Sequence, residues 1–355
     1  MLLLVLAGCR NPTVVEYEPY ESPGEVEPDD PLYGDQWHYR SINMPGAWGI
    51  VKDPDVSADF TTTVVAVVDT GIHHEHPDLD SQGSDEFDSI LFDPTADSGG
   101  YDFYSGEESY PGTEGVNGDL AGEASHGGEG RDTDPTDTGD YNRDSSPPRH
   151  TNSWHGSHVS GTIAADTQDD PEAGTGVAGI GWDSLQVLPV RVLGKWTYTN
   201  DIVSGIYYAS GIQAQSGSPV PQQPANVINM SLGGNIGVEP ALYDAIQAAV
   251  DDGITVLAAV GNSNNGGEPV MDPASYDNTV AVSATDARND LAPYSNVGSE
   301  VDFAAPGGDL TADVNADGKP DGVLSTSYND SSGDYDYAFY EGTSMAAPHV
   351  AGVVG

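Results

Sequence analysis

Short apolar runs that end in polar residues or glycine constrain the fold of this chain more than any other feature. Runs of this kind occupy residues 63–68, 185–193, 226–230, 255–260 and 279–283. They are typical of strands that are buried on both faces of a parallel sheet. Residues 201–210 and 240–252 instead space their apolar side chains as amphipathic helices do. The alternation predicts an α/β fold in which helices cover both faces of a mainly parallel sheet.

Residues 342–352, Gly-Thr-Ser-Met-Ala-Ala-Pro-His-Val-Ala-Gly, predict a serine placed at the start of a helix. Small residues allow a helix to begin at Ser344 and to pack tightly behind it. The N–H groups at a helix N-terminus stabilise negative charge, so this position suits a nucleophile. Such a serine needs a base, a carboxylate that orients the base, and a donor for an oxyanion.

Candidates for all three partners are present. Asp69 comes directly after the run 63–68, and Asn262 follows the run 255–260 after one glycine. His155 lies in Trp-His-Gly-Ser-His-Val-Ser-Gly, whose glycines allow close helix packing. Catalytic groups gather at the carboxyl ends of the strands in α/β sheets. These residues are therefore candidates for one site.

Four blocks in this order resemble the subtilisin-like serine peptidases (subtilases, peptidase family S8). The blocks are Val-Val-Asp-Thr-Gly at 67–71, His-Gly-Ser-His-Val-Ser-Gly at 155–161, Gly-Asn at 261–262 and Gly-Thr-Ser-Met-Ala-Ala-Pro-His at 342–349. The order Asp, His, Ser is the subtilisin order. The resemblance extends from about Asp30 to the end of the chain. It implies the three-layer subtilisin-like fold and a serine endopeptidase that hydrolyses polypeptides through an acyl-enzyme intermediate.

The resemblance assigns a role to each matching residue. Ser344 would be the nucleophile, His155 the general base and Asp69 the carboxylate that holds the histidine in its productive tautomer. Asn262 would donate its side-chain amide to the oxyanion, an interaction worth roughly 3 to 4 kcal/mol of barrier. An edge that pairs with an extended substrate as an added strand would be formed by the main chain of Ser231, Leu232 and Gly233.

Taken singly, these residues have simpler interpretations. An aspartate after a strand is commonly a turn former, and a serine before Ala-Ala is commonly a helix cap. Capping does not require four motifs in one order, so the catalytic interpretation is favoured. His158 and His349 lie inside the motifs but away from the catalytic positions, which predicts packing or hydrogen-bonding roles. The histidines at 73, 74 and 76 could form a metal cluster, but a structured loop is favoured over a zinc site.

Residues 313–321 resemble the first half of a calcium-binding loop. Oxygen-bearing side chains alternate, and Gly318 allows a sharp turn, although Leu324 stands where a bidentate glutamate is expected. The predicted calcium ligands are Asp313, Asn315, Asp317 and Asp321. The alternative is a surface turn rich in aspartate and glycine. By resemblance to the family, Asp78 and Asp30 are also expected to bind a structural calcium ion.

The N-terminus predicts export. Residues 1–9 resemble a lipoprotein signal that ends at Cys9, the cysteine that would be lipidated, with an ordinary secretion signal or a chance apolar start as alternatives. Residues 10–29 are rich in proline and glutamate and predict a solvated tether. The peptidase domain would occupy residues 30–355 and be incomplete at its C-terminus. The protein would then be a cell-envelope lipoprotein or a secreted protein.

Residues 81–150 form an acidic insertion between the Asp69 and His155 motifs. They contain 17 Asp or Glu against 3 Arg and no Lys, with many glycines and no amphipathic periodicity. A solvated, partly flexible insertion is favoured. The functional alternative is a set of calcium sites or a flap over the substrate cleft.

The formal charge of −47, from 57 acidic and 10 basic residues, excludes partners that need a basic surface. Nucleic acid and anionic membrane surfaces would repel the protein, so membrane contact is expected only through an N-terminal lipid anchor. We expect a monomer that acts on polypeptides. The alternative function is a catalytically inactive, subtilase-like surface module that binds calcium and protein partners.

Overall fold

The computed structural model describes most of the chain from Gly24 to Gly355. The described ranges are 24–53, 61–79, 89–93, 98–105, 131–140, 152–167, 176–182, 184–194, 196–264 and 267–355. Cys9, the predicted signal segment and most of the predicted tether lie outside these ranges. In the part of the chain that is described, no helix combines the length and the apolar composition that crossing a membrane requires.

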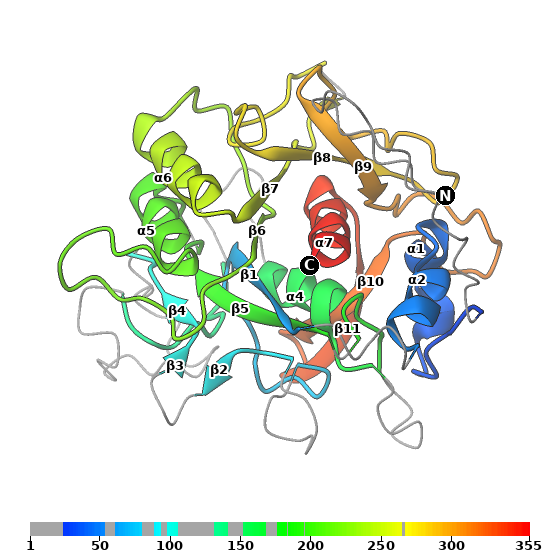
Figure 1. The fold of residues 1–355 in the computed structure, drawn as a ribbon. Helices are drawn as coiled ribbons and strands as arrows, with labels where there is room; N and C mark the ends of the chain where they lie inside the picture. The colour runs from blue at the N-terminus through cyan, green and yellow to red at the C-terminus, as the bar shows by residue number, and fades with distance from the viewer. Residues whose placement is uncertain are drawn as a thin grey trace, which may run out of the picture.

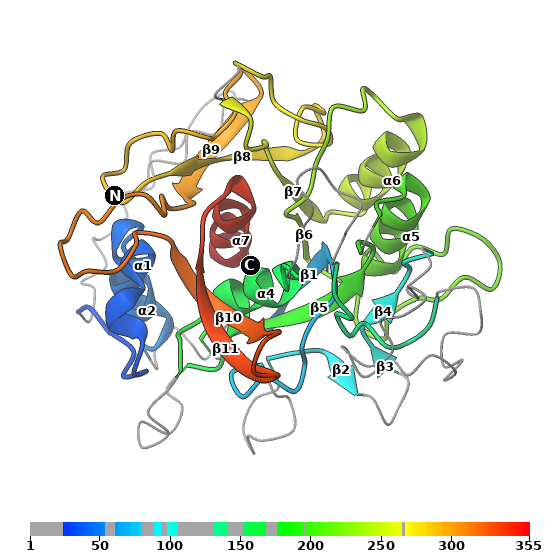
Figure 2. The same ribbon diagram turned by 180° about the vertical axis from the view of Figure 1, so that it is seen from behind.

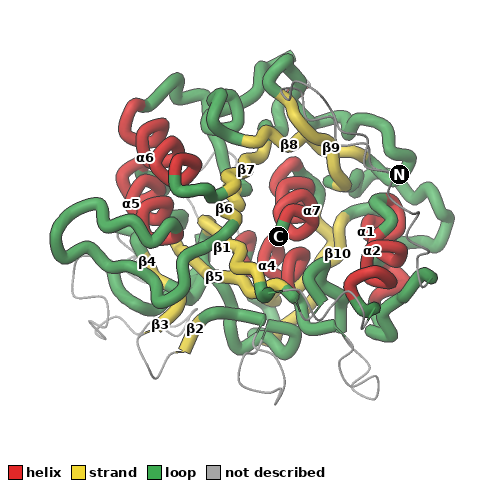
Figure 3. The backbone as a smooth tube through the Cα atoms, in the orientation of Figure 1, coloured by secondary structure: helices red, strands yellow, loops and turns green. Residues whose placement is uncertain are grey.

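A parallel sheet of seven strands runs through the centre of the molecule (Figures 1 and 3). In spatial order the strands are β4 (Tyr101–Asp102), β5 (Leu185–Arg191), β1 (Thr63–Asp69), β6 (Val227–Met230), β7 (Thr255–Ala259), β8 (Val280–Thr285) and β9 (Val301–Pro306). Each of the five apolar runs in the sequence forms one of these strands. The predicted α/β class is therefore confirmed.

Alternate side chains of β1 serve two separate hydrophobic cores. Val64, Ala66 and Val68 pack with residues of α5 (Thr199–Ala209) and α6 (Pro240–Asp251). Val65 and Val67 pack with residues of α4 (His155–Ala164) and α7 (Thr343–Val354) on the opposite face. Figure 2 shows the two helix pairs on the two sides of the sheet. A strand buried on both faces must be apolar at every position, which explains why its sequence does not alternate.

The two amphipathic helices predicted from apolar spacing are confirmed as α5 and α6, with ends that differ from the prediction by one or two residues. Helix α7 begins one residue before Ser344, as the small residues of this segment predict. A short 3-10 helix, η1 (Tyr33–Asp35), and the helices α1 (Trp37–Ser41) and α2 (Met44–Val51) pack against one another near the start of the described chain.

Several elements were not predicted. They are the edge strand β9, the antiparallel hairpin of β10 (Val323–Asn329) and β11 (Asp334–Tyr340), and a small sheet of β2 (Phe92–Asp93) and β3 (Ser98–Gly99). Aspartate and tyrosine alternate at the start of β11, and serine and threonine occupy the middle of β10, so neither strand has the apolar run that marks the central strands. The hydroxyls of Ser325 and Thr326 in β10 donate hydrogen bonds to carbonyl oxygens of α4, which holds the hairpin against this helix.

The described parts of the acidic insertion differ from the favoured expectation of a solvated segment. Strand β4 extends the central sheet beside β5, and Ile90, Phe92 and Phe103 are buried in the core. Residues 131–140 pack against the chain that follows Asp69. Burial of these apolar side chains accounts for the order of the segment despite its acidic composition.

Candidate active site

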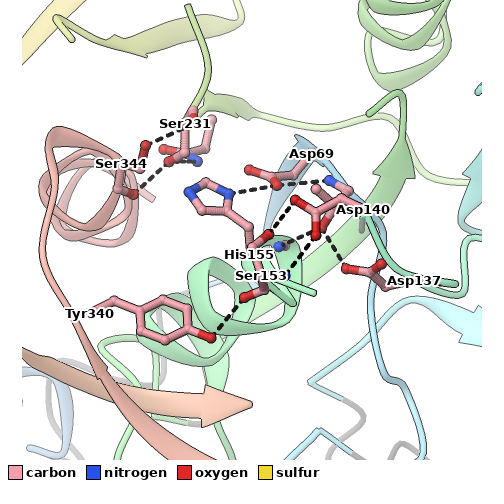
Figure 4. Close-up of polar contacts among 11 residues, drawn as sticks. Asp69, Asp137, Asp140, Ser153, His155, Ser231, Tyr340 and Ser344 are labelled. Carbon is pink, nitrogen blue, oxygen red and sulfur yellow. Dashed lines mark hydrogen bonds and ion pairs between the residues drawn. The ribbon is translucent and has the colours of Figure 1, made fainter. Parts of the chain in front are cut away.

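The carboxyl end of β1 and the N-terminus of α4 bring Asp69 and His155 together. His155 Nδ1 lies 2.7 Å from Asp69 Oδ1, and the same carboxylate oxygen accepts a hydrogen bond of 2.7 Å from the Thr70 N–H. Asp69 is fully buried, whereas 21% of the His155 side chain is exposed. The contact fixes the imidazole so that its other ring nitrogen faces Ser344, as Figure 4 shows.

Two local features place the start of α4, at His155, against the end of β1. Trp154 has left-handed backbone angles (φ 48°, ψ 37°), which turn the chain sharply into the helix. Gly156 lies so close to Gly71 that a Cβ atom there would be 2.1 Å from the Gly71 carbonyl oxygen. Only glycine allows this approach, so the conspicuous His-Gly pair of the sequence reflects packing at the end of β1.

Ser344 lies in the first turn of α7, beside the segment that follows β6. Its Oγ donates a 3.0 Å hydrogen bond to the Ser231 carbonyl oxygen, and Ser231 Oγ donates a 2.8 Å bond to the Ser344 carbonyl oxygen. The reciprocal pair links the serine to the predicted substrate edge, in which Leu232 is half-buried and Gly233 exposed. Hydroxyl, imidazole and carboxylate thus follow one another across the site (Figure 4).

Asn262, which follows β7, is held beside the start of α7. Its Oδ1 accepts hydrogen bonds from the N–H and the Oγ1 of Thr343, both at 2.9 Å. Its Nδ2 lies 3.3 Å from the position that a Cβ atom on Gly342 would take. Because the oxygen is occupied by Thr343, the amide donor is the group left to face an oxyanion next to Ser344.

The pKa of His155 reflects opposing effects. Burial alone would lower it, but the carboxylate of Asp69, with those of Asp140 and Asp137 behind it, outweighs burial and raises the pKa above its usual value. Burial raises the pKa of Asp137 to about 7. The imidazolium that forms when His155 accepts a proton is therefore stabilised chiefly by Asp69, with a smaller contribution from Asp140.

The other histidines have the packing roles that the sequence predicts. His158 contacts the carbonyl oxygens of Val323 and Ala338 and stacks on Tyr340. His349 contacts the Met345 carbonyl oxygen and lies 2.8 Å from Nδ1 of His38.

The three histidines after Asp69 each contact a different partner. His73 stacks on Tyr328, His74 lies against Phe92, and His76 contacts the Asp336 carbonyl oxygen. These contacts belong to a structured loop under the β10–β11 hairpin, which is the favoured interpretation of this sequence.

The predicted calcium residues divide into two groups. In the 313–321 loop, Asp313 accepts hydrogen bonds from the N–H groups of Asp317 and Gly318, and Asp321 accepts one from Val314. Within the described ranges, no group of three or more His, Cys, Asp or Glu side chains is arranged to hold a metal ion. These are the contacts of a turn that satisfies its own N–H groups.

Asp30 and Asp78, in contrast, come together. Both carboxylates are buried, and Oδ1 of each lies within 4 Å of the position that a Cβ atom on Gly176 would take. Asp78 also accepts hydrogen bonds from the Tyr337 hydroxyl and the Val177 N–H. Carboxylate oxygens are the ligands that calcium prefers.

Several residues around the site were missed by the sequence analysis. Thr70, Asp137, Asp140, Ser153 and Tyr340 form a hydrogen-bonded network around His155 (Figure 4). The signal available for two of them was Asp-Thr-Gly-Asp at 137–140, but it lies in a segment with many other acidic residues.

Known proteins resemble this chain over most of its length. It is 37% identical to an extracellular protease of Xanthomonas campestris pv. campestris over 93% of this chain and 49% of that protein. It is 35% identical to an extracellular basic protease of Dichelobacter nodosus over 93% of this chain and 48% of that protein. Thermitase of Thermoactinomyces vulgaris is 31% identical over 92% of this chain and 84% of that protein. The chain thus spans about half the length of the first two relatives.

A solved protease structure from Pseudoalteromonas arctica PAMC 21717 superposes with a TM-score of 0.71 at 36% identity, over 92% of this chain and 86% of that one. The likeness confirms the predicted three-layer subtilisin-like fold. A family model described as the subtilase family matches residues 61–355, which contain all four sequence blocks. The chain therefore belongs to the subtilase family of serine peptidases.

Proposed function

We propose that the protein is a serine endopeptidase that hydrolyses peptide bonds with Ser344 as nucleophile. The observation that carries the proposal is the placement of His155 between the buried carboxylate of Asp69 and the hydroxyl of Ser344 (Figure 4). Membership of the subtilase family and the protease relatives support the same reaction. A binding module would need no such alignment of three side chains.

The residues divide the reaction into two steps. Ser344 Oγ attacks the carbonyl carbon of the scissile bond while His155 accepts its proton, and Asp69 stabilises the resulting imidazolium. Asn262 and the N-terminus of α7 stabilise the oxyanion. His155 returns the proton to the departing amine, which leaves an acyl-enzyme ester. A water molecule then attacks the ester carbonyl carbon while His155 accepts a proton from it. His155 passes that proton to Ser344 Oγ as the C–O bond of the ester breaks, which releases the acid product and restores the serine hydroxyl.

The substrate class follows from the main chain beside Ser344. Residues 231–233 continue from β6 at the edge of the site, and Gly233 is exposed. An extended peptide that adds to this edge as a strand would place its carbonyl group beside Ser344 Oγ. This edge favours polypeptides over simple esters as substrates.

Export and calcium binding are further parts of the proposal. The named extracellular proteases among the relatives support export, through either a lipid-anchored Cys9 or secretion. Asp30 and Asp78 would hold a calcium ion, which would supply a structural cross-link between the start of the domain and the loop after β1. The loop 313–321 would bind a second calcium ion through Asp313, Asn315, Asp317 and Asp321.

Labelling with a fluorophosphonate probe tests the proposal. The full-length protein should be labelled and should digest casein into peptides, and Ser344→Ala should do neither. Labelling without casein digestion would indicate an esterase-like site and contradict the peptidase assignment. A folded protein that is not labelled would instead favour the inactive surface module.

A further inference from the structure

The acidic segment 131–140 lies directly behind the loop that carries Asp69. The N–H of Ile72 donates a 3.0 Å hydrogen bond to the Pro135 carbonyl oxygen, and the Asp137 N–H donates a 3.1 Å bond to the Ile72 carbonyl oxygen. A Cβ atom on Gly71 would lie 2.5 Å from the Pro135 carbonyl oxygen. The fit is so close that the position of this segment and the position of the β1 end are fixed together.

One hydroxyl links Asp137 to the backbone of Gly156, the residue after His155. Thr70 Oγ1 donates a 2.6 Å hydrogen bond to Asp137 Oδ2 and accepts a 2.9 Å bond from the Gly156 N–H. Thr70 is next to Asp69, and Gly156 is next to His155. The hydroxyl therefore connects the backbone beside Asp69 to the backbone beside His155. Asp137, which is 2% exposed, determines which way the hydroxyl proton points.

Asp140 holds the chain on the other side of His155. Its two carboxylate oxygens accept hydrogen bonds from the N–H and the Oγ of Ser153, at 2.7 and 2.8 Å. The Ser153 carbonyl oxygen accepts a 2.7 Å bond from the hydroxyl of Tyr340, four residues before Ser344. Ser153 precedes Trp154, whose left-handed backbone angles are energetically unfavourable for a residue other than glycine. Hydrogen bonds from neighbouring segments to Ser153 help to hold the backbone in this conformation.

We propose that Asp137 and Asp140 are positioning residues that hold the backbone on both sides of His155, so that two particular side chains of the acidic segment align the histidine (Figure 4). The proposal rests on the proposed function, since it concerns the alignment of the same histidine. It gives a role to a segment whose composition alone indicates only a solvated loop.

The charges around this network bear on its pH dependence. The carboxylates of Asp69, Asp140 and Asp137 face His155, and His158 lies one turn further along α4. Asp137 in turn faces the buried guanidinium of Arg191 and the carboxylate of Asp140. Removing the carboxylate of Asp140 should lower the pKa of His155, because this carboxylate stabilises the protonated imidazole. Burial raises the pKa of Asp137 to about 7, so Asp137 adds to this effect only at pH values at which it is ionised.

Two variants of Thr70 test whether its hydroxyl positions His155 without changing any charge in the site. Thr70→Val removes the hydroxyl at almost constant volume, whereas Thr70→Ser keeps it. We expect kcat to fall about 10- to 100-fold in Thr70→Val with KM nearly unchanged, and to stay within about threefold in Thr70→Ser. Thermal unfolding identifies the temperature range in which both variants are folded. If kcat in that range is the same for both, the proposal is wrong.

Charge variants test the two aspartates themselves. Asp137→Asn and Asp140→Asn should each lower kcat about tenfold, and Asp140→Asn should also move the acid limb of the pH profile to lower pH. Asp134→Asn replaces another carboxylate of the same segment, but Asp134 is exposed and its side chain accepts hydrogen bonds from Thr136 in the local turn. It should leave kcat and the profile unchanged. An equal effect of all three variants would indicate a general field of the acidic segment and overturn the proposal.

A spectroscopic readout keeps this test independent of the proposed activity. In the Ser344→Ala background, NMR of histidine labelled with ¹⁵N reports the His155 titration and its Nδ1–H resonance, which His155→Gln identifies. Thr70→Val should broaden or shift that resonance, and Asp140→Asn should lower the pKa of His155. Suppose that both changes are seen but the fluorophosphonate does not label the protein that retains Ser344. The positioning role would then be upheld, and the proposed function would fail. If the protein that retains Ser344 is active but the Nδ1–H resonance is the same with and without Thr70→Val, only the positioning role is contradicted.

Discussion

Asp69 Oδ1 and His155 Nδ1 are separated by 2.7 Å in space and by 86 residues in the chain. The distance is short because β1 ends, and α4 begins, where Gly71 and Gly156 permit the two backbones to touch. The Asp–His contact is therefore a consequence of backbone packing at the sheet edge as much as of side-chain attraction.

The pH dependence of activity should reflect this pair. Burial alone would lower the pKa of His155, but Asp69 and the two aspartates behind it raise it. A base must be neutral, so kcat/KM should fall with decreasing pH, with a midpoint above the ordinary histidine value of 6.5. Asp69→Asn should lower that pKa and reduce kcat by about 10⁴-fold. A midpoint well below 6.5 in the unmodified enzyme would contradict this account.

The raised pKa of His155 also affects stability. As pH rises, activity should increase, but the stabilisation that His155 gains from its carboxylate partners should decrease. The protonated form of His155 is favoured in the folded state, so the stabilisation by its carboxylate partners is complete below the unfolded pKa. It is lost as pH rises through the folded pKa. In the Ser344→Ala background, Asp69→Asn should therefore cost more unfolding free energy at pH 5 than at pH 9, as measured by denaturant titration.

The oxyanion donor can be tested without disturbing the helix that it contacts. Asn262→Asp keeps an oxygen that can accept from Thr343 but removes the amide donor, so kcat should fall about 100- to 1,000-fold with little change in KM. Thr343→Ser retains the hydroxyl contact and should have a small effect. A large rise in KM at constant kcat in Asn262→Asp would indicate substrate binding instead.

The close approach behind His155 predicts a strong steric effect. Gly156→Ala would place a Cβ atom 2.1 Å from the Gly71 carbonyl oxygen, which forces the histidine away from Asp69. We expect at least about a 100-fold loss of kcat/KM. Gly34→Ala is the matched control, because a Cβ atom there would have no neighbour within 4 Å. Equal activity of the two variants would show that α4 can shift freely.

Buried neutral histidines should make the fold sensitive to acid. Burial lowers the pKa of His349 to about 4. The unfolded state binds the proton first, so stability should decrease as pH falls from 6.5 towards 4, by up to about 3 kcal/mol for this group. Denaturant unfolding of Ser344→Ala between pH 7.5 and pH 4.5 measures the slope. His349→Gln should start less stable and show a smaller slope, whereas an unchanged slope would exclude His349 as a contributor.

Much of the fold and of the catalytic set was determined by local sequence. A strand buried on both faces has to be apolar at nearly every position, so the apolar runs at 63–68 and 255–260 predict central strands. The groups expected at their carboxyl ends, Asp69 and Asn262, lie there. Ser344 is in the first turn of a helix because the small residues around it permit one.

Only the tertiary structure decided what surrounds His155. Thr70 meets Asp137 across 67 residues, and Ser153 meets Tyr340 across 187. No periodicity marks such contacts, because they depend on how an irregular segment fits behind a strand end. In the sequence, Asp137 and Asp140 are two among many acidic residues. In the fold, the same two side chains hold the backbone on either side of the histidine, because packing against Gly71 brings their segment there.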